Sequence, residues 1–119
     1  MEKSKSFTDL MAWQKAHALV LICYEITAKF PREELFGLIS QMRRAAVSVP
    51  ANIAEGFKKK GKSDKIRFMN IAEASLEELK YYFILAKELK YYQTDEIFLK
   101  AEEVGKIIYS YCNSITKSI

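Results

Sequence analysis

Apolar residues recur at alternating spacings of three and four positions in four long segments of this chain. An α-helix turns once every 3.6 residues, so this spacing places the apolar side chains of each segment on one helix face. Only four Gly and two Pro occur, few for an all-β fold that must turn often. The pattern therefore predicts four amphipathic helices, at about residues 9–29, 33–60, 64–89 and 94–118.

Residues with helix-boundary preferences lie at or near the ends of these segments. Thr8, Ser63 and Thr94 precede helical segments and are expected to be N-caps, because a hydroxyl can accept a hydrogen bond from a first-turn N–H. Pro31 is expected to end the first helix, since the residue before proline is disfavoured in the α conformation. Pro50 lies within the second segment, where we expect a kink because proline cannot donate to the carbonyl one turn earlier.

The connectors between the four segments are short, about 3–6 residues, which makes successive helices antiparallel. Sustained 3-4 seams favour side-by-side packing at crossing angles near about +20°. The predicted fold class is all-α, an antiparallel up-down-up-down four-helix bundle. We expect residues 1–8 to be a short N-terminal tail and residues 9–118 to form the single bundle domain.

The first segment carries more apolar surface than one bundle contact requires. We expect its core seam to be Leu10, Trp13, His17, Val20, Tyr24 and Thr27. A second apolar row runs beside it, at Ala16, Leu19, Cys23, Ile26 and Phe30. The third segment, whose expected seam is Phe68, Ala72, Ser75, Leu79, Tyr82, Ala86 and Leu89, also has apolar residues off that seam. A helix that is apolar on two sides is buried on both, so we predict a homo-oligomer.

Composition bounds the class of protein. The chain has 119 residues, of which 50% are hydrophobic and 29% charged, enough for one domain with a core. Cys23 and Cys112 lie far apart without metal-type spacing, so we expect reduced thiols, no cofactor and a cytoplasmic location. The first ten residues do not resemble a signal peptide. The most apolar run, Ala16–Ile26, is about half of a membrane span, so no membrane association is expected.

The positive charge is concentrated in one connector. The chain holds 19 Lys and Arg against 15 Asp and Glu. Six of these cations, with the single anion Asp64, lie in residues 57–67, where the second segment turns into the third: Lys58, Lys59, Lys60, Lys62, Lys65 and Arg67. A compact basic patch binds phosphate backbones or acidic partners. The other interpretation is a solvated connector. The string GFKKKGKS lacks the P-loop spacing and a preceding strand, so it is not a nucleotide-phosphate loop.

A polar row follows the second segment. At 100° per residue its members fall within about 80° of one another. They are Gln41, Arg44, Ser48, Asn52 and Glu55. We interpret the row as a structural network beside the core, in which Arg44 pairs with Glu78 of the third segment and Asn52 satisfies carbonyls released by Pro50. The alternative is a polar cleft that binds a ligand.

No catalytic constellation accompanies these features. His17 is the single histidine and is interpreted as a core or interface residue. No nucleophile–base pair is present, and Glu55 has no second metal-type ligand nearby. The tyrosines, spaced as helix-packing residues, are interpreted as seam residues rather than as stacking platforms for bases. We therefore expect a protein that is not an enzyme.

Several strings in the chain resemble one bacterial family. They are residues 41–56, QMRRAAVSVPANIAEG; Phe7, Leu10, Trp13 and Ala16; the 30–38 turn with Phe30-Pro31 and Phe36-Gly37-Leu38; and Ala74-Ser75-Leu76 with Glu78-Leu79. Together they cover most of residues 7–90. The chain resembles the four-helix-bundle proteins encoded in intervening sequences of 23S ribosomal RNA genes, a family labelled ribosomal-protein-like.

This resemblance implies a fold and an assembly. Members of the family are single antiparallel bundles that form a ring, typically a pentamer. A relative, the accessory protein of diversity-generating retroelements, binds nucleic acid and a reverse transcriptase through a basic surface. That surface is not a compact motif, so the resemblance assigns no binding residue here.

Two functions remain open at this point. In the first, rings of basic connectors bind RNA, DNA or a nucleic-acid-bound protein. In the second, the protein is an interaction scaffold with no nucleic-acid role, and its lysines serve solubility. Salt separates the two, because phosphate contacts weaken steeply with ionic strength while an apolar protein interface barely responds.

Overall fold

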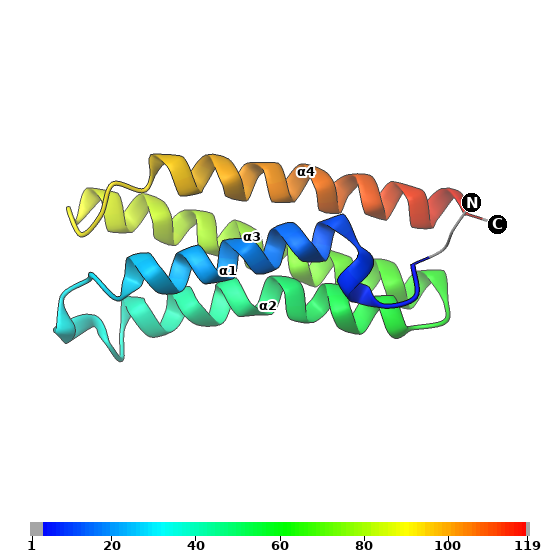
Figure 1. Cartoon of the computed structure of the whole chain (residues 1–119), viewed down its shortest axis with the longest axis horizontal. Coiled ribbons are helices and arrows are strands. Elements are labelled where there is room, and N and C mark those ends of the chain that lie inside the picture. The colour runs from blue at the N-terminus through cyan, green and yellow to red at the C-terminus, as the bar shows by residue number, and fades with distance from the viewer. Residues whose placement is uncertain (1–3, 119) are drawn as a thin grey trace.

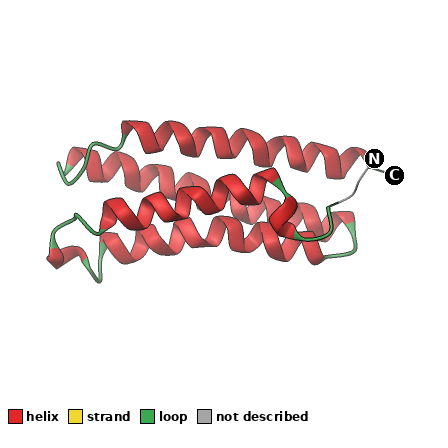
Figure 2. Cartoon of the chain, viewed as in Figure 1, coloured by secondary structure: helices red, strands yellow, loops and turns green. Residues whose placement is uncertain are grey.

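The computed structural model describes residues 4–118, which form four α-helices and two short 3-10 turns. No strand occurs among these residues (Figure 2). The elements in chain order are η1 (Phe7–Asp9), α1 (Met11–Thr27), η2 (Arg32–Glu34), α2 (Leu38–Lys58), α3 (Lys62–Glu88) and α4 (Asp95–Lys117). The prediction of an all-α, four-helix fold is confirmed. No helix of this part of the chain is long and apolar enough to cross a membrane.

The four helices lie side by side in one elongated bundle of 49 × 23 × 20 Å (Figure 1). Each helix contacts the next in the chain, and α4 contacts α1, which closes the bundle. The chain reverses at every connector. The α1–α2 and α3–α4 connectors lie at one end, and the α2–α3 connector lies at the other end with both termini (Figure 1). Features far apart in sequence therefore meet at each end.

The core follows the predicted 3-4 spacing most closely in α2 and α4. In α2 the buried seam includes Leu38, Met42, Ala45, Val49 and Ile53. In α4 it includes Ile97, Ala101, Val104, Ile108 and Ile115. Pro50 is buried within α2, which continues through it as one helix.

The predicted seam of the first helix is correct only at Val20 and Thr27, which are buried. The core of α1 is the row interpreted as the second one, with Ala16, Leu19, Cys23 and Ile26 buried. His17 is exposed and stacks on Trp13, with ring centroids 4.8 Å apart. Both rows are apolar, so periodicity does not distinguish them.

In α3 the predicted seam is half correct. Ala72, Leu79 and Ala86 are buried as expected. The other buried positions lie one residue further along than predicted, at Met69, Leu76 and Phe83. Phe68, Ser75 and Tyr82 are half-buried at the edge of the core.

The helix starts also differ from the predicted caps. Thr8 lies inside η1, whose N-cap is Ser6 in a reciprocal capping box with Asp9. This turn contacts α1 and α2, so part of the predicted tail packs on the bundle. Helix α1 begins only at Met11, after an extended Leu10.

The two later caps differ as well. Ser63 lies inside α3, whose N-cap is Gly61. Thr94 does occupy the N-cap of α4, but its buried hydroxyl donates to the Phe83 carbonyl at 2.6 Å instead of capping. Thr94 therefore ties the start of α4 to α3.

At the end away from the termini, Glu34 joins the two connectors. The second helix was expected from about residue 33, but residues 32–34 form η2 and α2 starts at Leu38. The Glu34 carboxylate accepts from the Leu38 N–H at 3.0 Å and from the Tyr91 hydroxyl at 2.8 Å. These two hydrogen bonds lower the pKa of Glu34, the backbone one most. One side chain thus caps α2 and holds the α3–α4 connector.

Candidate nucleic-acid interface

The basic connector is the sharp turn between α2 and α3. Helix α2 ends at Lys58 and α3 begins at Lys62, so only three residues join them. Gly56 allows this tight approach: a Cβ there would lie 2.6 Å from the Met69 Cε and 2.9 Å from the Phe68 Cβ. Such distances are below van der Waals contact, so a larger residue would force α2 and α3 apart.

Three of the six cations that were predicted to bind nucleic acid already have partners within the bundle. The Lys65 ammonium donates to the Phe57 carbonyl at 2.6 Å, and its burial lowers the pKa of Lys65. The Lys62 ammonium donates to the Ser118 carbonyl, near the C-terminal end of α4. These two lysines satisfy carbonyls at the ends of α2 and α4, which is favourable because helix C-termini carry partial negative charge.

Arg67 is the third occupied cation. Its guanidinium lies 3.6 Å from the Asp64 carboxylate one turn earlier in α3, and both side chains are exposed. An exposed pair of this kind is worth about 0–1 kcal/mol. Arg67 is therefore held loosely, whereas Lys62 and Lys65 belong to the helix ends.

The lysine run Lys58, Lys59 and Lys60 differs from those three cations. All three side chains are exposed. Within residues 4–118 none of them has a hydrogen-bond or ion-pair partner, and Lys59 lies over the Phe68 ring at 5.1 Å. The charge available to an outside ligand is therefore concentrated in this run.

The polar row of α2 is only partly a network. Ser48 and Ser75 share a hydrogen bond of 2.8 Å between α2 and α3. The Asn52 amide donates to the Ser48 carbonyl at 2.8 Å and to its hydroxyl at 3.0 Å. The expectation that Asn52 serves a carbonyl released by Pro50 is therefore wrong, since Pro50 withholds its bond from Ala46. Gln41 and Glu55 are exposed.

The predicted ion pair between Arg44 and Glu78 is absent from the described part of the chain. Both residues are exposed, and the Glu78 carboxylate instead accepts from the Tyr82 hydroxyl at 2.6 Å. That hydrogen bond is the main cause of the raised pKa of Tyr82. Arg44 therefore leaves no buried carboxylate behind when it is removed, and the large cost expected of such a loss does not apply.

Its neighbour Arg43 makes the contacts that the sequence did not indicate. The Arg43 Nε donates to the hydroxyl of buried Thr27 at 2.9 Å, and its Nη2 donates to the Tyr24 carbonyl at 3.4 Å. The guanidinium also lies 4.5 Å from the Tyr24 ring centroid. Arg43 thus joins α2 to the C-terminal turn of α1.

We expect Arg43→Ala to lower the free energy of unfolding by about 1–3 kcal/mol, because the Thr27 hydroxyl and the Tyr24 carbonyl lose a charged donor. Arg44→Ala is the matched control, one residue away, and should change it by no more than about 0.5 kcal/mol. Urea denaturation of both variants measures the difference. If both variants lose the same free energy of unfolding, the hydrogen bonds of Arg43 to α1 do not stabilise the bundle specifically.

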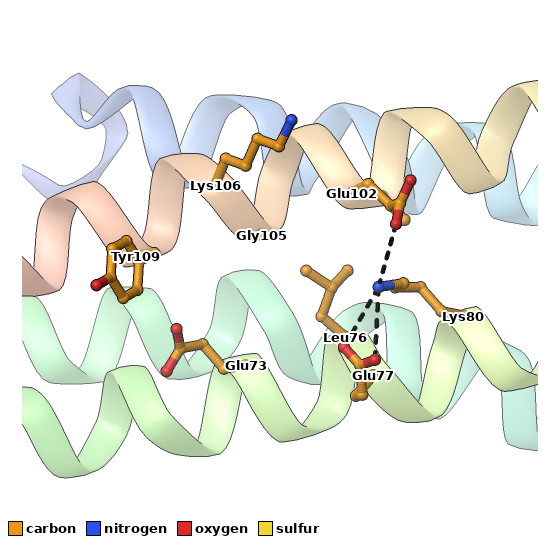
Figure 3. A pocket seen from close by; sticks show the side chains of 9 residues that line it. Glu73, Leu76, Glu77, Lys80, Glu102, Gly105, Lys106 and Tyr109 are labelled. Carbon is orange, nitrogen blue, oxygen red and sulfur yellow. Dashed lines mark hydrogen bonds and ion pairs between the residues drawn. The ribbon is translucent and has the colours of Figure 1, made fainter.

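A hollow with several charged side chains lies between α3 and α4 (Figure 3). It has a volume of about 410 Å³ and is lined by Glu73, Glu77, Lys80, Glu102, Lys106 and Tyr109, among others. Lys80 lies between two of its carboxylates, 3.4 Å from Glu77 and 3.8 Å from Glu102. The Lys80 ammonium bridges Glu77 and Glu102, whereas partial burial raises the pKa of the third carboxyl group, Glu73.

The two cysteine thiols are poorly reactive. Burial raises the pKa of the Cys23 thiol to about 12 and of the Cys112 thiol to about 11. A thiol with such a pKa is a poor nucleophile near neutral pH, because the thiolate is the reactive form. In the part of the chain that the structure describes, no three His, Cys, Asp or Glu side chains are arranged to hold a metal ion.

The fold and this end of the molecule define a class: a small helical bundle with a basic turn at one end. Comparison with known proteins gives the family. The profile described as 23S rRNA-intervening sequence protein matches residues 8–110, so the chain belongs to that family. No curated protein matches the chain.

A solved structure shares the fold. It is a protein of unknown function from the S23 ribosomal protein family of Bacteroides thetaiotaomicron VPI-5482, with a TM-score of 0.79 and 23% sequence identity. The match covers 86% of this chain and 95% of that one. The likeness establishes the common fold across nearly the whole of both chains.

Proposed function

We propose that this protein is a non-enzymatic nucleic-acid-binding protein whose contact surface is the basic end of the bundle. The observation that carries the proposal is the lysine run: Lys58, Lys59 and Lys60 are exposed, adjacent and without partners among residues 4–118. Ammonium groups held at a rigid helix end attract phosphates without reading base sequence. Outside residues 57–67 the chain holds 13 cations and 14 anions, so attraction is focused on this end.

The proposal is tested by the salt dependence of binding. A labelled oligonucleotide, titrated with the protein at several salt concentrations, should bind with a log K that falls linearly with log salt concentration. Three neutralised phosphates per copy give a slope of about −2 to −3. Fluorescence anisotropy measures the affinity. A protein that binds neither RNA nor DNA at low salt would refute the proposal.

We further propose that the protein acts as a cyclic homo-oligomer, with five subunits as the family resemblance implies. Support comes from the connector between α1 and α2, where Phe36 is 93% exposed and Leu35 is 46% exposed. Together with Tyr24, Ile39 and Val47 they line a hollow of about 630 Å³, which also includes Arg43 and Arg44. A phenyl ring in water at such a hollow, with apolar and Arg side chains beside it, is typical of a protein contact.

A ring would strengthen the nucleic-acid contact. Cyclic symmetry places every copy of the α2–α3 connector on the same face, so the lysine runs form one basic rim. One strand can then contact several runs at once, which raises the affinity without any new type of contact. The same apolar surface also suits the alternative function, a protein-interaction scaffold that docks a different chain. Weak salt dependence would favour that alternative.

A further inference from the structure

Two phenylalanine rings lie under the basic connector, each half-buried and each covered by cations. The Lys65 ammonium lies 5.4 Å from the centroid of the Phe57 ring. The Phe68 ring has two cations over it, the Lys59 ammonium at 5.1 Å and the Arg67 guanidinium at 4.9 Å. Aromatic rings interleaved with cations are what single-stranded nucleic acid requires, because bases stack on the rings while phosphates meet the charges.

The cations over the two rings differ in how firmly other groups of the protein bind them. Lys65 is bound to the α2 carbonyls, so the Phe57 ring is covered by a lysine that belongs to the helix end. Lys59 has no hydrogen bond or ion pair in the described chain, and Arg67 has only an exposed pair with Asp64. Both cations over Phe68 can therefore move to a phosphate at little cost, and this exposes the face of the ring.

The base of the Phe68 side chain is held in place. The α2 backbone at Gly56 approaches so closely that a Cβ there would lie 2.9 Å from the Phe68 Cβ. The ring itself is partly buried and packs against the core, whereas the cations over it, Lys59 and Arg67, are exposed side chains. A preorganised aromatic surface binds with less loss of conformational freedom than a flexible one.

We propose that the basic connector selects single-stranded nucleic acid, with one unpaired base stacked on the Phe68 ring. In this arrangement Lys58, Lys59 and Lys60 contact the flanking phosphates, and the Arg67 guanidinium stacks on the outer face of the base. The bases of a duplex are already stacked on one another and present only phosphates to this end. The inference rests on the proposed function and adds the form of nucleic acid that is bound.

The test compares Phe68→Leu with Phe57→Leu, a matched control in the same connector. Leucine keeps the apolar packing of either site and removes the aromatic face. Three labelled probes of about 15 nucleotides are titrated at low salt: oligothymidylate, oligouridylate and a mixed-sequence duplex. The two single strands also show whether the sugar matters. Thermal melting verifies that each variant is folded.

The parent protein should bind at least one of the single strands more tightly than the duplex. Phe68→Leu should weaken single-strand binding about 5- to 100-fold, the range that stacking contributes per base. It should leave both the duplex affinity and the salt slope unchanged, because the phosphate contacts remain. Phe57→Leu should alter none of these quantities. If Phe68→Leu does not fold, Phe68→Tyr keeps the ring and should retain the preference.

Other outcomes separate this inference from the proposed function. Equal parent affinity for single strands and duplex, or equal losses in the two leucine variants, would overturn the stacking site while charge-based binding stands. Loss of the single-strand preference in a folded Phe68→Tyr would do the same. No binding of any probe by the parent at low salt would refute the proposed function itself.

Discussion

Replacing Lys58, Lys59 and Lys60 together with Glu should reduce nucleic-acid affinity about 100-fold or more at low salt, because attraction at the contact becomes repulsion. All three side chains are exposed and have no hydrogen-bond or ion-pair partner in residues 4–118, so within the bundle the substitution removes only the contact of Lys59 with the exposed side of the Phe68 ring. The melting temperature should therefore change little. Anisotropy titration of the variant beside the parent measures the loss.

The matched control reverses three exposed lysines elsewhere on the bundle: Lys15, Lys100 and Lys106. It produces the same change in net charge, so it tests whether position rather than total charge decides the affinity. The control should bind far more tightly than the lysine-run variant. If both variants lose the same affinity, the protein attracts nucleic acid through its overall charge, and the connector is not the site.

The helices were predictable from the sequence because their period is set by backbone geometry. Which apolar row of α1 faces the core was not, because Trp13 and His17 stand on one row and Ala16 and Cys23 on the other. Packing decided the matter: the row with Ala16 and Cys23 is buried. The half-buried Trp13 ring packs against the edge of the core and stacks with His17, so a histidine interpreted as a core or interface residue is exposed in the single chain.

The basic connector shows a different limit of prediction from sequence: charges can be counted, but their partners in the fold cannot be identified. Its six cations were visible as a charge cluster, but the partners of two of them, Lys62 and Lys65, are backbone carbonyls that belong to helix ends. Lys62 reaches the end of α4, which is more than fifty residues away in the chain. Only the fold brings those carbonyls to the connector. Counting charges therefore overestimated the cations available to a ligand, and it gave no sign that Arg67 and Lys59 share one phenyl ring.

The Arg44 prediction was wrong for a related reason. A helical wheel shows which side chains share a face, but it does not show whether that face is buried or exposed to solvent. Arg44 lies on an exposed part of α2, where a carboxylate partner is unnecessary. Arg43, one position along, reaches the neutral hydroxyl of Thr27 on another helix. A prediction based on opposite charges therefore identified neither Arg43 as the arginine that joins two helices nor Thr27 as its partner.

The change expected to affect the assembly most is Phe36→Asp. The ring is 93% exposed in the single chain, so it adds almost nothing to the core of that chain, and the variant should fold like the parent. If Phe36 docks in a neighbouring copy, a buried unpaired carboxylate there would break the contact. Light scattering after size exclusion should then show the parent at a multiple of 13.8 kDa and the variant at 13.8 kDa.

Phe36→Leu is the control, because it keeps an apolar side chain and should preserve the assembly. The connector between α1 and α2, which contains Phe36, lies at the opposite end of the bundle from the connector between α2 and α3, so the variant leaves the basic end intact (Figure 1). A separated copy should therefore bind a short strand as the parent does. It should bind a long strand more weakly, because several linked lysine runs no longer act together. A parent that is already a single chain at micromolar concentration would contradict the assembly and leave each lysine run to act alone.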